Sequence, residues 1–209
     1  MSFAEAAIGA SDHYGRAELV TLAVRDAVPV FLDRRRVELI DNGLPSAPYH
    51  HEALALDIGA AIDLVNRVRR SVAEHARAAL STLRAHCRAR VLILPASPYD
   101  RLPDSLEEVL RSRPLTYAAD GMLYRESLAE AAAGIGMEVR RYPRRTDPTV
   151  LAAEAMGVGV AEVASIIARF GREAGTPWRK DHKVAAAAAL SVLGPRIRQA
   201  GTGPAAMMR

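Results

Sequence analysis

The first 41 residues constrain the fold most, because they hold three extended segments with short connections. Residues 3–10 are small and apolar, residues 18–25 are rich in Val, Leu and Thr, and residues 28–41 continue this extended pattern. Only the turn-like residues 11–15 and 26–27 separate them. Parallel neighbours need a crossover of roughly a dozen residues or more. The pattern therefore predicts an antiparallel meander of three strands, with Asp12 in the first turn.

The rest of the chain alternates between helical and extended patterns. Apolar residues recur at helical spacing over 57–86, and the short apolar run 90–95 is typical of a buried strand. Residues 96–119 are predicted to be irregular apart from a short helix at 105–111. Further helices are expected at 120–133, 149–156, 160–174 and from 178 to 193, with a strand at 137–142. This order predicts an α/β fold in which a mixed sheet has helices on both faces. Residues 1–193 are expected to form one domain, followed by a flexible tail, 194–209.

Composition narrows the class of protein. The chain has 209 residues, 50% hydrophobic and 25% charged, which is typical of a globular domain. No apolar run is long enough for a membrane span, the N-terminus lacks the pattern of a secretory signal, and Cys87 is the single cysteine. A cytoplasmic protein without a membrane partner is therefore expected. The net charge of +4 permits nucleic-acid binding without requiring it.

Two stretches of the C-terminal half resemble a known family. Residues 120–133 and 136–143 are similar to the helix, glycine turn, strand and proline loop of the Holliday-junction resolvase branch of the RNase H-like superfamily. Lys180, Asp181 and His182 open an alanine-rich helix that is similar to the closing acidic helix of that branch. The order of elements over residues 3–193 agrees with this resemblance, which implies an RNase H-like fold.

The resemblance also implies a chemistry. Nucleases of this family hold two divalent metals about 4 Å apart, and such ions take carboxylate oxygens. Their acids come from the first strand, the end of the fourth strand and the last helix. Asp12 and Asp181 are therefore the candidate catalytic and metal-binding residues, with Mg²⁺ or Mn²⁺ as the cofactor and DNA or RNA as the partner. The expected fourth strand carries no acid, since Asp100 and Asp104 come only later.

Basic clusters are the candidate phosphate contacts. Arg140, Arg141, Arg144 and Arg145 are predicted to bind nucleic-acid phosphates. The alternative is solvated charge on an edge strand, which also applies to the three arginines at 34–36.

Each candidate acid also has a purely structural explanation. Asp12 suits a turn, where its side chain bonds nearby backbone, and Asp181 suits the first turn of a helix. Trp178 is expected to be a packing anchor. The pair His50 and His51 is expected in a solvated loop, because adjacent side chains in an extended segment point apart.

Three functions remain open. The first is a divergent metal-dependent nuclease or a nucleic-acid-binding protein. The second is a non-catalytic scaffold of the same fold, working through a protein partner or as a homodimer in which helix 57–86 offers the dimer face. The third is a small-molecule enzyme with His13 or His182 as general base. The chain lacks the P-loop, nucleophile-elbow, zincin and Cys-x-x-Cys motifs.

Overall fold

The fold of this chain is known from a computed structural model, which describes residues 6–201 and their side chains as far as residue 197. Five strands and six α-helices follow one another in these residues, with one 3-10 turn, η1 (Glu52–Ala55), before the first helix. Their bounds are β1 Ala6–His13, β2 Arg16–Arg25, β3 Val28–Glu38, α1 Ile58–Cys87, β4 Ala89–Pro95, α2 Leu106–Arg111, α3 Arg113–Gly134, β5 Glu138–Tyr142, α4 Pro148–Met156, α5 Val160–Ala174 and α6 Lys180–Gly201.

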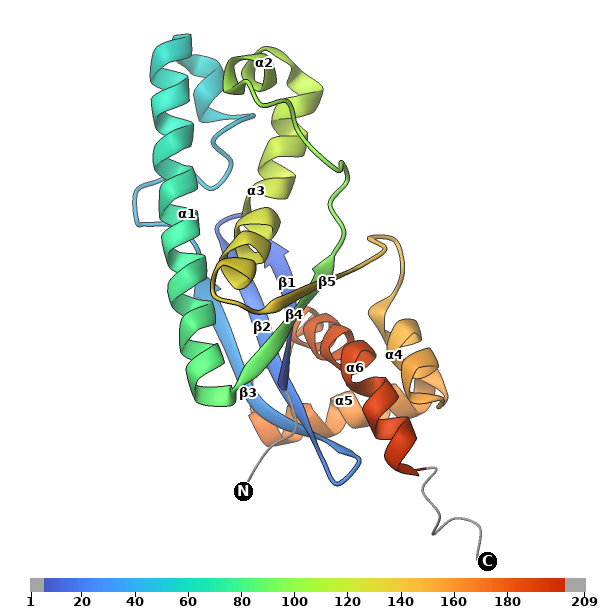
Figure 1. The fold of residues 1–209 in the computed structure, drawn as a ribbon. Helices are drawn as coiled ribbons and strands as arrows, with labels where there is room; N and C mark the ends of the chain where they lie inside the picture. The colour runs from blue at the N-terminus through green and yellow to red at the C-terminus, as the bar shows by residue number, and fades with distance from the viewer. Residues whose placement is uncertain (1–5, 202–209) are drawn as a thin grey trace, which may run out of the picture.

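The strands form one mixed sheet in the order β3-β2-β1-β4-β5. Strands β1, β2 and β3 pair antiparallel, as their short connections predict. Strands β4 and β5 then add parallel to β1, each after a helical crossover. The predicted mixed sheet is therefore confirmed (Figure 1). The carboxyl ends of β1, β4 and β5 lie at the same edge of the sheet.

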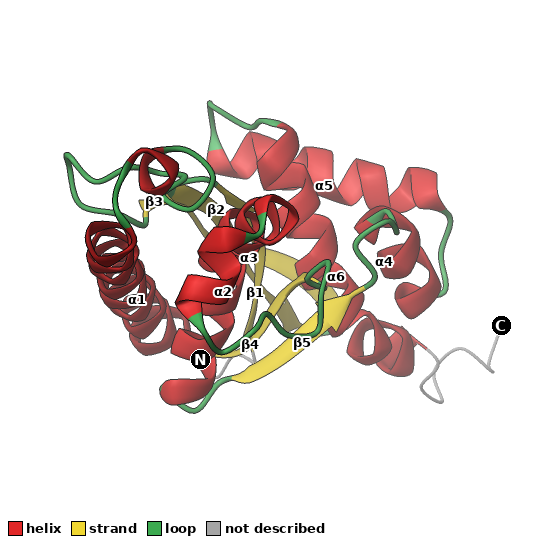
Figure 2. Ribbon diagram, turned by 90° about the horizontal axis from the view of Figure 1, so that it is seen from above, coloured by secondary structure: helices red, strands yellow, loops and turns green. Residues whose placement is uncertain are grey.

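Helices cover both faces of the sheet, as Figure 2 shows. One apolar cluster joins the sheet to α1 and α3, and a second joins it to α4, α5 and α6. Side chains of a strand alternate between faces, so Ile8 of β1 belongs to the first cluster and Ala7 to the second. This alternation decides where the polar residues at the end of β1 point.

Three predicted boundaries differ from the structure. Strand β1 runs through His13, so Asp12 lies in the strand and not in the turn. Helix α3 begins at Arg113 and not at 120, because Pro114 occupies its first turn, where proline is well tolerated. Helix α6 continues past Gly194 and Pro195 to Gly201. The first part of the predicted flexible tail is thus helical, and residues 202–209 lie outside the described residues.

Among residues 6–201, no single helix is long and apolar enough to cross a membrane. Helices α4 and α5 meet the length and composition requirement only together, with a bend of 106° between them.

Candidate functional site

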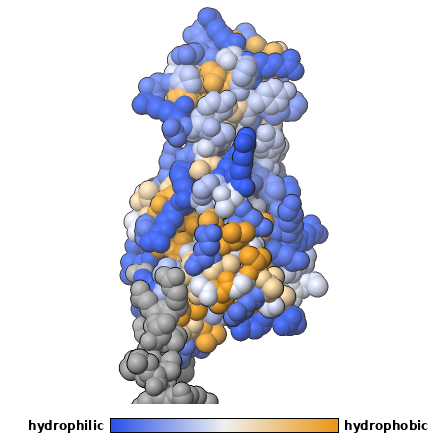
Figure 3. All heavy atoms as spheres, turned by 90° about the vertical axis from the view of Figure 1, so that its right-hand side faces the viewer, coloured by the Kyte–Doolittle hydropathy of each residue, from blue (hydrophilic) through white to orange (hydrophobic). Residues whose placement is uncertain are grey.

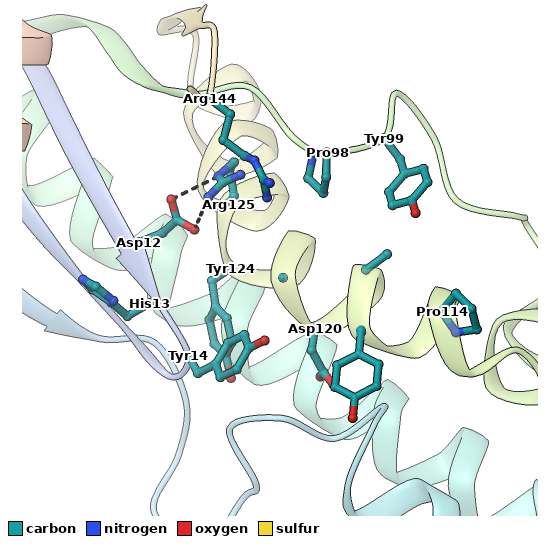
Figure 4. A pocket seen from close by; sticks show the side chains of 13 residues that line it. Asp12, His13, Tyr14, Pro98, Tyr99, Pro114, Asp120, Tyr124, Arg125 and Arg144 are labelled. Atoms are coloured by element: carbon teal, nitrogen blue, oxygen red, sulfur yellow. Dashed lines mark hydrogen bonds and ion pairs between the residues drawn. The ribbon is translucent and has the colours of Figure 1, made fainter. Parts of the chain in front are cut away.

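The main candidate site is an open cleft at the carboxyl ends of β1 and β4, with a volume of about 560 Å³. The end of β1, the first half of α3 and the loop after β4 form its walls (Figure 4). Its lining combines tyrosines, two arginines and two aspartates. The residues are Asp12, His13, Tyr14, Pro98, Tyr99, Pro114, Tyr117, Ala118, Asp120, Gly121, Tyr124, Arg125 and Arg144.

A buried ion pair forms the floor of this cleft. Arg125 of α3 donates from Nε to Asp12 Oδ1 at 3.1 Å and from Nη2 to Asp12 Oδ2 at 3.0 Å. The exposed fractions of the two side chains are only 11% and 7%. Arg125 Nη1 also donates to the carbonyl oxygen of Ala96, at 3.1 Å. Asp12 therefore joins β1 to α3 and to the end of β4, and its carboxylate is neutralised.

His13 points to the opposite face of the sheet from Asp12. Its Nε2 lies 3.1 Å from Oδ2 of Asp181, in the first turn of α6. About a third of each of these side chains is exposed. The two predicted metal ligands, Asp12 and Asp181, are thus separated by the alternation of β1, and each already has a basic partner.

Tyrosines make up the exposed aromatic surface of the cleft. Tyr14, Tyr99 and Tyr117 have exposed fractions of 45%, 47% and 48%, whereas Tyr49, Tyr124 and Tyr142 are buried. All three exposed tyrosines line the cleft. Burial, together with the charge of Asp120, raises the pKa of Tyr14 above its ordinary value. Tyr14 therefore keeps its proton at neutral pH and offers both an aromatic face and a donor.

Asp120 fastens the loop before η1 to α3 behind this wall. Its fully buried carboxylate accepts hydrogen bonds from the backbone N–H of Tyr49, at 3.1 Å, and of His50, at 2.8 Å. His50 Nδ1 lies 2.5 Å from the same carboxylate, and the His50 ring stacks on Tyr117 with centroids 4.4 Å apart. Burial raises the pKa of Asp120 above its ordinary value, and the hydrogen bonds from His50 and the backbone offset only part of this rise. His50 is thus a buried anchor and not the solvated loop residue that the sequence predicts.

The four predicted phosphate-binding arginines occupy different environments. Arg140 pairs with Glu138 at 2.7 Å, and Arg141 pairs with Glu126 at 2.6 Å. Arg144 lines the cleft beside Arg125 (Figure 4), and Arg145 is exposed. Within residues 6–197, no ion pair engages Arg144, so it supplies the free positive charge of the cleft.

Two solved structures of one protein have a fold similar to that of this chain. A structure of RuvC from Thermus thermophilus has a TM-score of 0.53 and 13% sequence identity, and the match covers 89% of this chain and 92% of that one. The T. thermophilus RuvC in complex with Holliday junction substrate has a TM-score of 0.52 and 12% identity over 90% of this chain and 92% of that one. This chain has the RNase H-like fold of RuvC. No protein-family model and no curated protein matches the sequence.

The two-metal centre implied by an RNase H-like fold does not fit the residues present. Strand β4 contains no carboxylate, and a Cβ atom placed on Gly9 of β1 would lie 1.8 Å from the carbonyl oxygen of Ala185 in α6. The backbone of α6 therefore lies directly against β1 at Gly9. Nowhere in the described part of the chain do three metal-ligating side chains converge. Residues 6–197 therefore offer no set of ligands for a two-metal reaction.

The start of α6 is filled by packing and ion pairs instead. His182 is buried, with Nε2 3.1 Å from Oε2 of the buried Glu18 and with Nδ1 accepting from the backbone N–H of Arg179 at 2.9 Å. Trp178 stacks on His182, with centroids 5.5 Å apart, and on the other side covers Gly171. Trp178 is thus a packing residue, as its sequence context predicts. Both nitrogens of His182 are occupied, which argues against the hypothesis that it acts as a general base.

The sequence-based prediction missed most of the cleft. Arg125, Asp120 and the three exposed tyrosines were not singled out, because they come from segments that the fold alone brings together. One signal was available for the acids. Asp12 and His13 are adjacent on an extended segment, and adjacent residues of a strand face opposite sides. Side chains on α6 could therefore meet only one of them.

Proposed function

We propose that this chain binds nucleic acid in the tyrosine-lined cleft, by stacking unpaired bases on tyrosines and contacting a neighbouring phosphate through Arg144. The carrying observation is that all exposed tyrosines within residues 6–197 line one cleft. Stacking of a base on an aromatic side chain contributes about 1–3 kcal/mol and tolerates any base.

The charge of the cleft supports the same ligand class. The charges of Asp12 and Arg125 cancel each other in their ion pair, and the carboxylate of Asp120 is buried behind the wall. Arg144 then gives the exposed surface a positive charge, which favours a phosphate. A RuvC structure with a Holliday junction supports nucleic acid as the ligand class, which we extend to this chain by its fold.

Unpaired bases are the preferred ligand. Bases within a duplex are paired and stacked on each other, so their faces are unavailable to Tyr14, Tyr99 and Tyr117. A cleft of about 560 Å³ is within the usual size of small-ligand sites. We therefore assign the cleft to single-stranded segments or to unpaired nucleotides at a junction, bound without metal-dependent cleavage.

Fluorescence anisotropy with short labelled oligonucleotides tests this function. We expect single-stranded DNA or RNA to bind more tightly to the cleft than a duplex of the same sequence. Tyr117→Ala should weaken single-strand binding by roughly 5- to 150-fold, the equivalent of about 1–3 kcal/mol, whereas Tyr117→Phe should keep most of the affinity. Unchanged affinity in Tyr117→Ala in place of this roughly 5- to 150-fold loss, or no binding of any single strand at low salt, would overturn the proposal.

A protein–protein contact is the second candidate, and it has its own observation. Apolar side chains gather over α4 and α6 in Figure 3, where Val150 is exposed and Leu151 and Val192 are half-buried. The apolar side of α1 packs inside the chain, so we place this candidate contact on α4 and α6 in preference to helix 57–86. Light scattering of the wild type and of Val150→Asp tests this candidate. A monomer at all concentrations would exclude the homodimer.

A further inference from the structure

We propose that α1 carries a second nucleic-acid surface, which binds the phosphate backbone of a duplex. We name this surface the arginine stripe and define it by Arg67, Arg70, Arg77, Arg84 and Arg88. It shares no residue with the cleft, and the inference does not depend on the proposed function of the cleft.

The geometry of α1 aligns these side chains. Arg70, Arg77 and Arg84 follow one another at intervals of seven residues, which is close to two helical turns. Arg88 follows directly after α1 as its C-cap residue, in a left-handed backbone conformation with φ of 56°, and is exposed beside Arg84 at the end of the row. The buried residues of α1 lie on the opposite side of the helix, against the sheet and α3. The helical row from Arg70 to Arg84 is therefore straight, exposed and roughly 21 Å long.

The arginines of the stripe have no ion-pair partner in the described part of the chain. Eight arginines elsewhere form ion pairs with carboxylates. Within residues 6–197, no ion pair or hydrogen bond engages the side chains of the stripe. The carboxylates along this side of α1 are Glu74 and Asp63, and neither neutralises an arginine. Five guanidinium groups are thus available for an external anion.

Two hollows along the helix provide room for phosphates. One, of about 370 Å³, is lined by Arg84, Arg88 and Arg90, and none of its lining residues is acidic. The other, of about 820 Å³, is lined by Arg67, Arg69 and Arg70, with Asp63 at its edge. Small residues stand between the arginines, namely Ala73, Ser81 and Ala85, so a backbone can approach the helix closely.

Charge density identifies the occupant as a duplex. Double-stranded nucleic acid presents about one negative charge per 1.7 Å of its axis, the densest regular array of phosphates available to such a row. The exposed side of α1 at the stripe has no aromatic residue on which an unpaired base could stack. The stripe therefore contacts backbone without reading bases, in contrast to the cleft.

The salt dependence of duplex binding by the full chain tests this inference. The probe is a short labelled DNA duplex, and the variants are Arg77→Gln/Arg84→Gln and, as a control with the same loss of charge, Arg172→Gln/Lys183→Gln on α5 and α6. Each lost phosphate contact should lower the slope of log K against log salt by about 0.9. We expect the stripe variant to lose about 1.8 in slope and about tenfold in affinity, and the control to change little.

Two outcomes would overturn the inference. One is an equal loss in the stripe variant and the control, because net charge alone would then explain binding. The other is a wild-type slope in the stripe variant. Tyr117→Ala separates this inference from the proposed function. It should weaken single-strand binding and leave duplex binding unchanged, and an equal loss of both would mean that the cleft is the shared site.

Discussion

At the end of β1, one face of the sheet borders an open cleft and the other is covered by a helix, although the residues that point to the two faces are adjacent. On the side of α3, Asp12 pairs with Arg125 below an open cleft. On the side of α6, the helix lies directly on Gly9, and the pairs of His13 with Asp181 and of Glu18 with His182 fill the remaining space. The comparison teaches that the same strand can have one side filled by packing and ion pairs and still border an open cleft on the other side.

Removal of the Asp12 carboxylate should give the largest effect on this comparison. Asp12→Ala leaves the buried guanidinium of Arg125 without its partner, which costs about 3–5 kcal/mol in the free energy of unfolding. Urea denaturation followed by circular dichroism measures it. The double variant Asp12→Ala/Arg125→Met removes both charges and should regain most of the loss. A double variant that is less stable than Asp12→Ala would contradict the assignment of Asp12 to a buried pair.

The second largest effect should come from a substitution on the face of the sheet that α6 covers. Gly9→Ala places a methyl group against the backbone of Ala185, so α6 must shift, and we expect a loss of about 1–3 kcal/mol. Gly121→Ala on α3 is the matched control, because no atom lies within 4 Å of its added Cβ. This control should gain about 0.5–1 kcal/mol, since glycine weakens a helix interior. Melting temperatures that shift in the same direction in both variants would show that Gly9 is not a close contact.

Asp181 should contribute far less to stability than Asp12, although the sequence-based prediction gives both acids the same role. The pair of Asp181 with His13 is about one-third exposed, and exposed ion pairs contribute about 1 kcal/mol or less. Asp181→Asn should therefore change thermal stability slightly and leave single-strand binding unaffected. A loss of stability as large as that of Asp12→Ala would mean that the ion pairs on the two faces contribute equally.

The smallest expected effect is that of divalent metal ions on nucleic-acid binding and cleavage. Because the donor set does not fit a two-metal centre, EDTA should leave single-strand binding in the cleft unchanged. Mg²⁺ or Mn²⁺ should yield no cleavage of single strands, duplexes or four-way junctions in a gel assay. A product that forms with Mn²⁺ and disappears with EDTA would revive the nuclease hypothesis and locate its ligands outside Asp12 and Asp181.

The sequence predicts the fold well because each element has its own local pattern. The short connections around residues 11–15 and 26–27 already require antiparallel strands, and the spacing of Val65, Val68 and Val72 marks the buried side of α1. Pro114 misled the prediction of where α3 begins, since proline is common in loops and also begins helices. Gly194 and Pro195 misled the prediction of where α6 ends.

The cleft was less accessible to sequence reasoning, because its contacts are remote along the chain. Asp12 and Arg125 are 113 residues apart, and Asp120 meets His50 across 70 residues. No local pattern encodes such pairs. Carboxylates are abundant and ambiguous, so the family resemblance drew attention to Asp12 and Asp181 as metal ligands, whereas the structure gives each a basic partner within the chain.

The hydrogen bonds of Asp120 have a consequence for how a ligand would enter the cleft. Asp120 holds the loop at Tyr49 and His50, and Tyr124 donates from its hydroxyl to the carbonyl oxygen of Ser46, at 2.8 Å, in the same loop. The loop behind Tyr117 and Tyr14 is thus held in place before any ligand arrives. Binding then need not order this loop, so less of the interaction energy is lost to conformational entropy. Association should accordingly proceed in a single fast phase, and differences in affinity between ligands should lie in how slowly each ligand leaves.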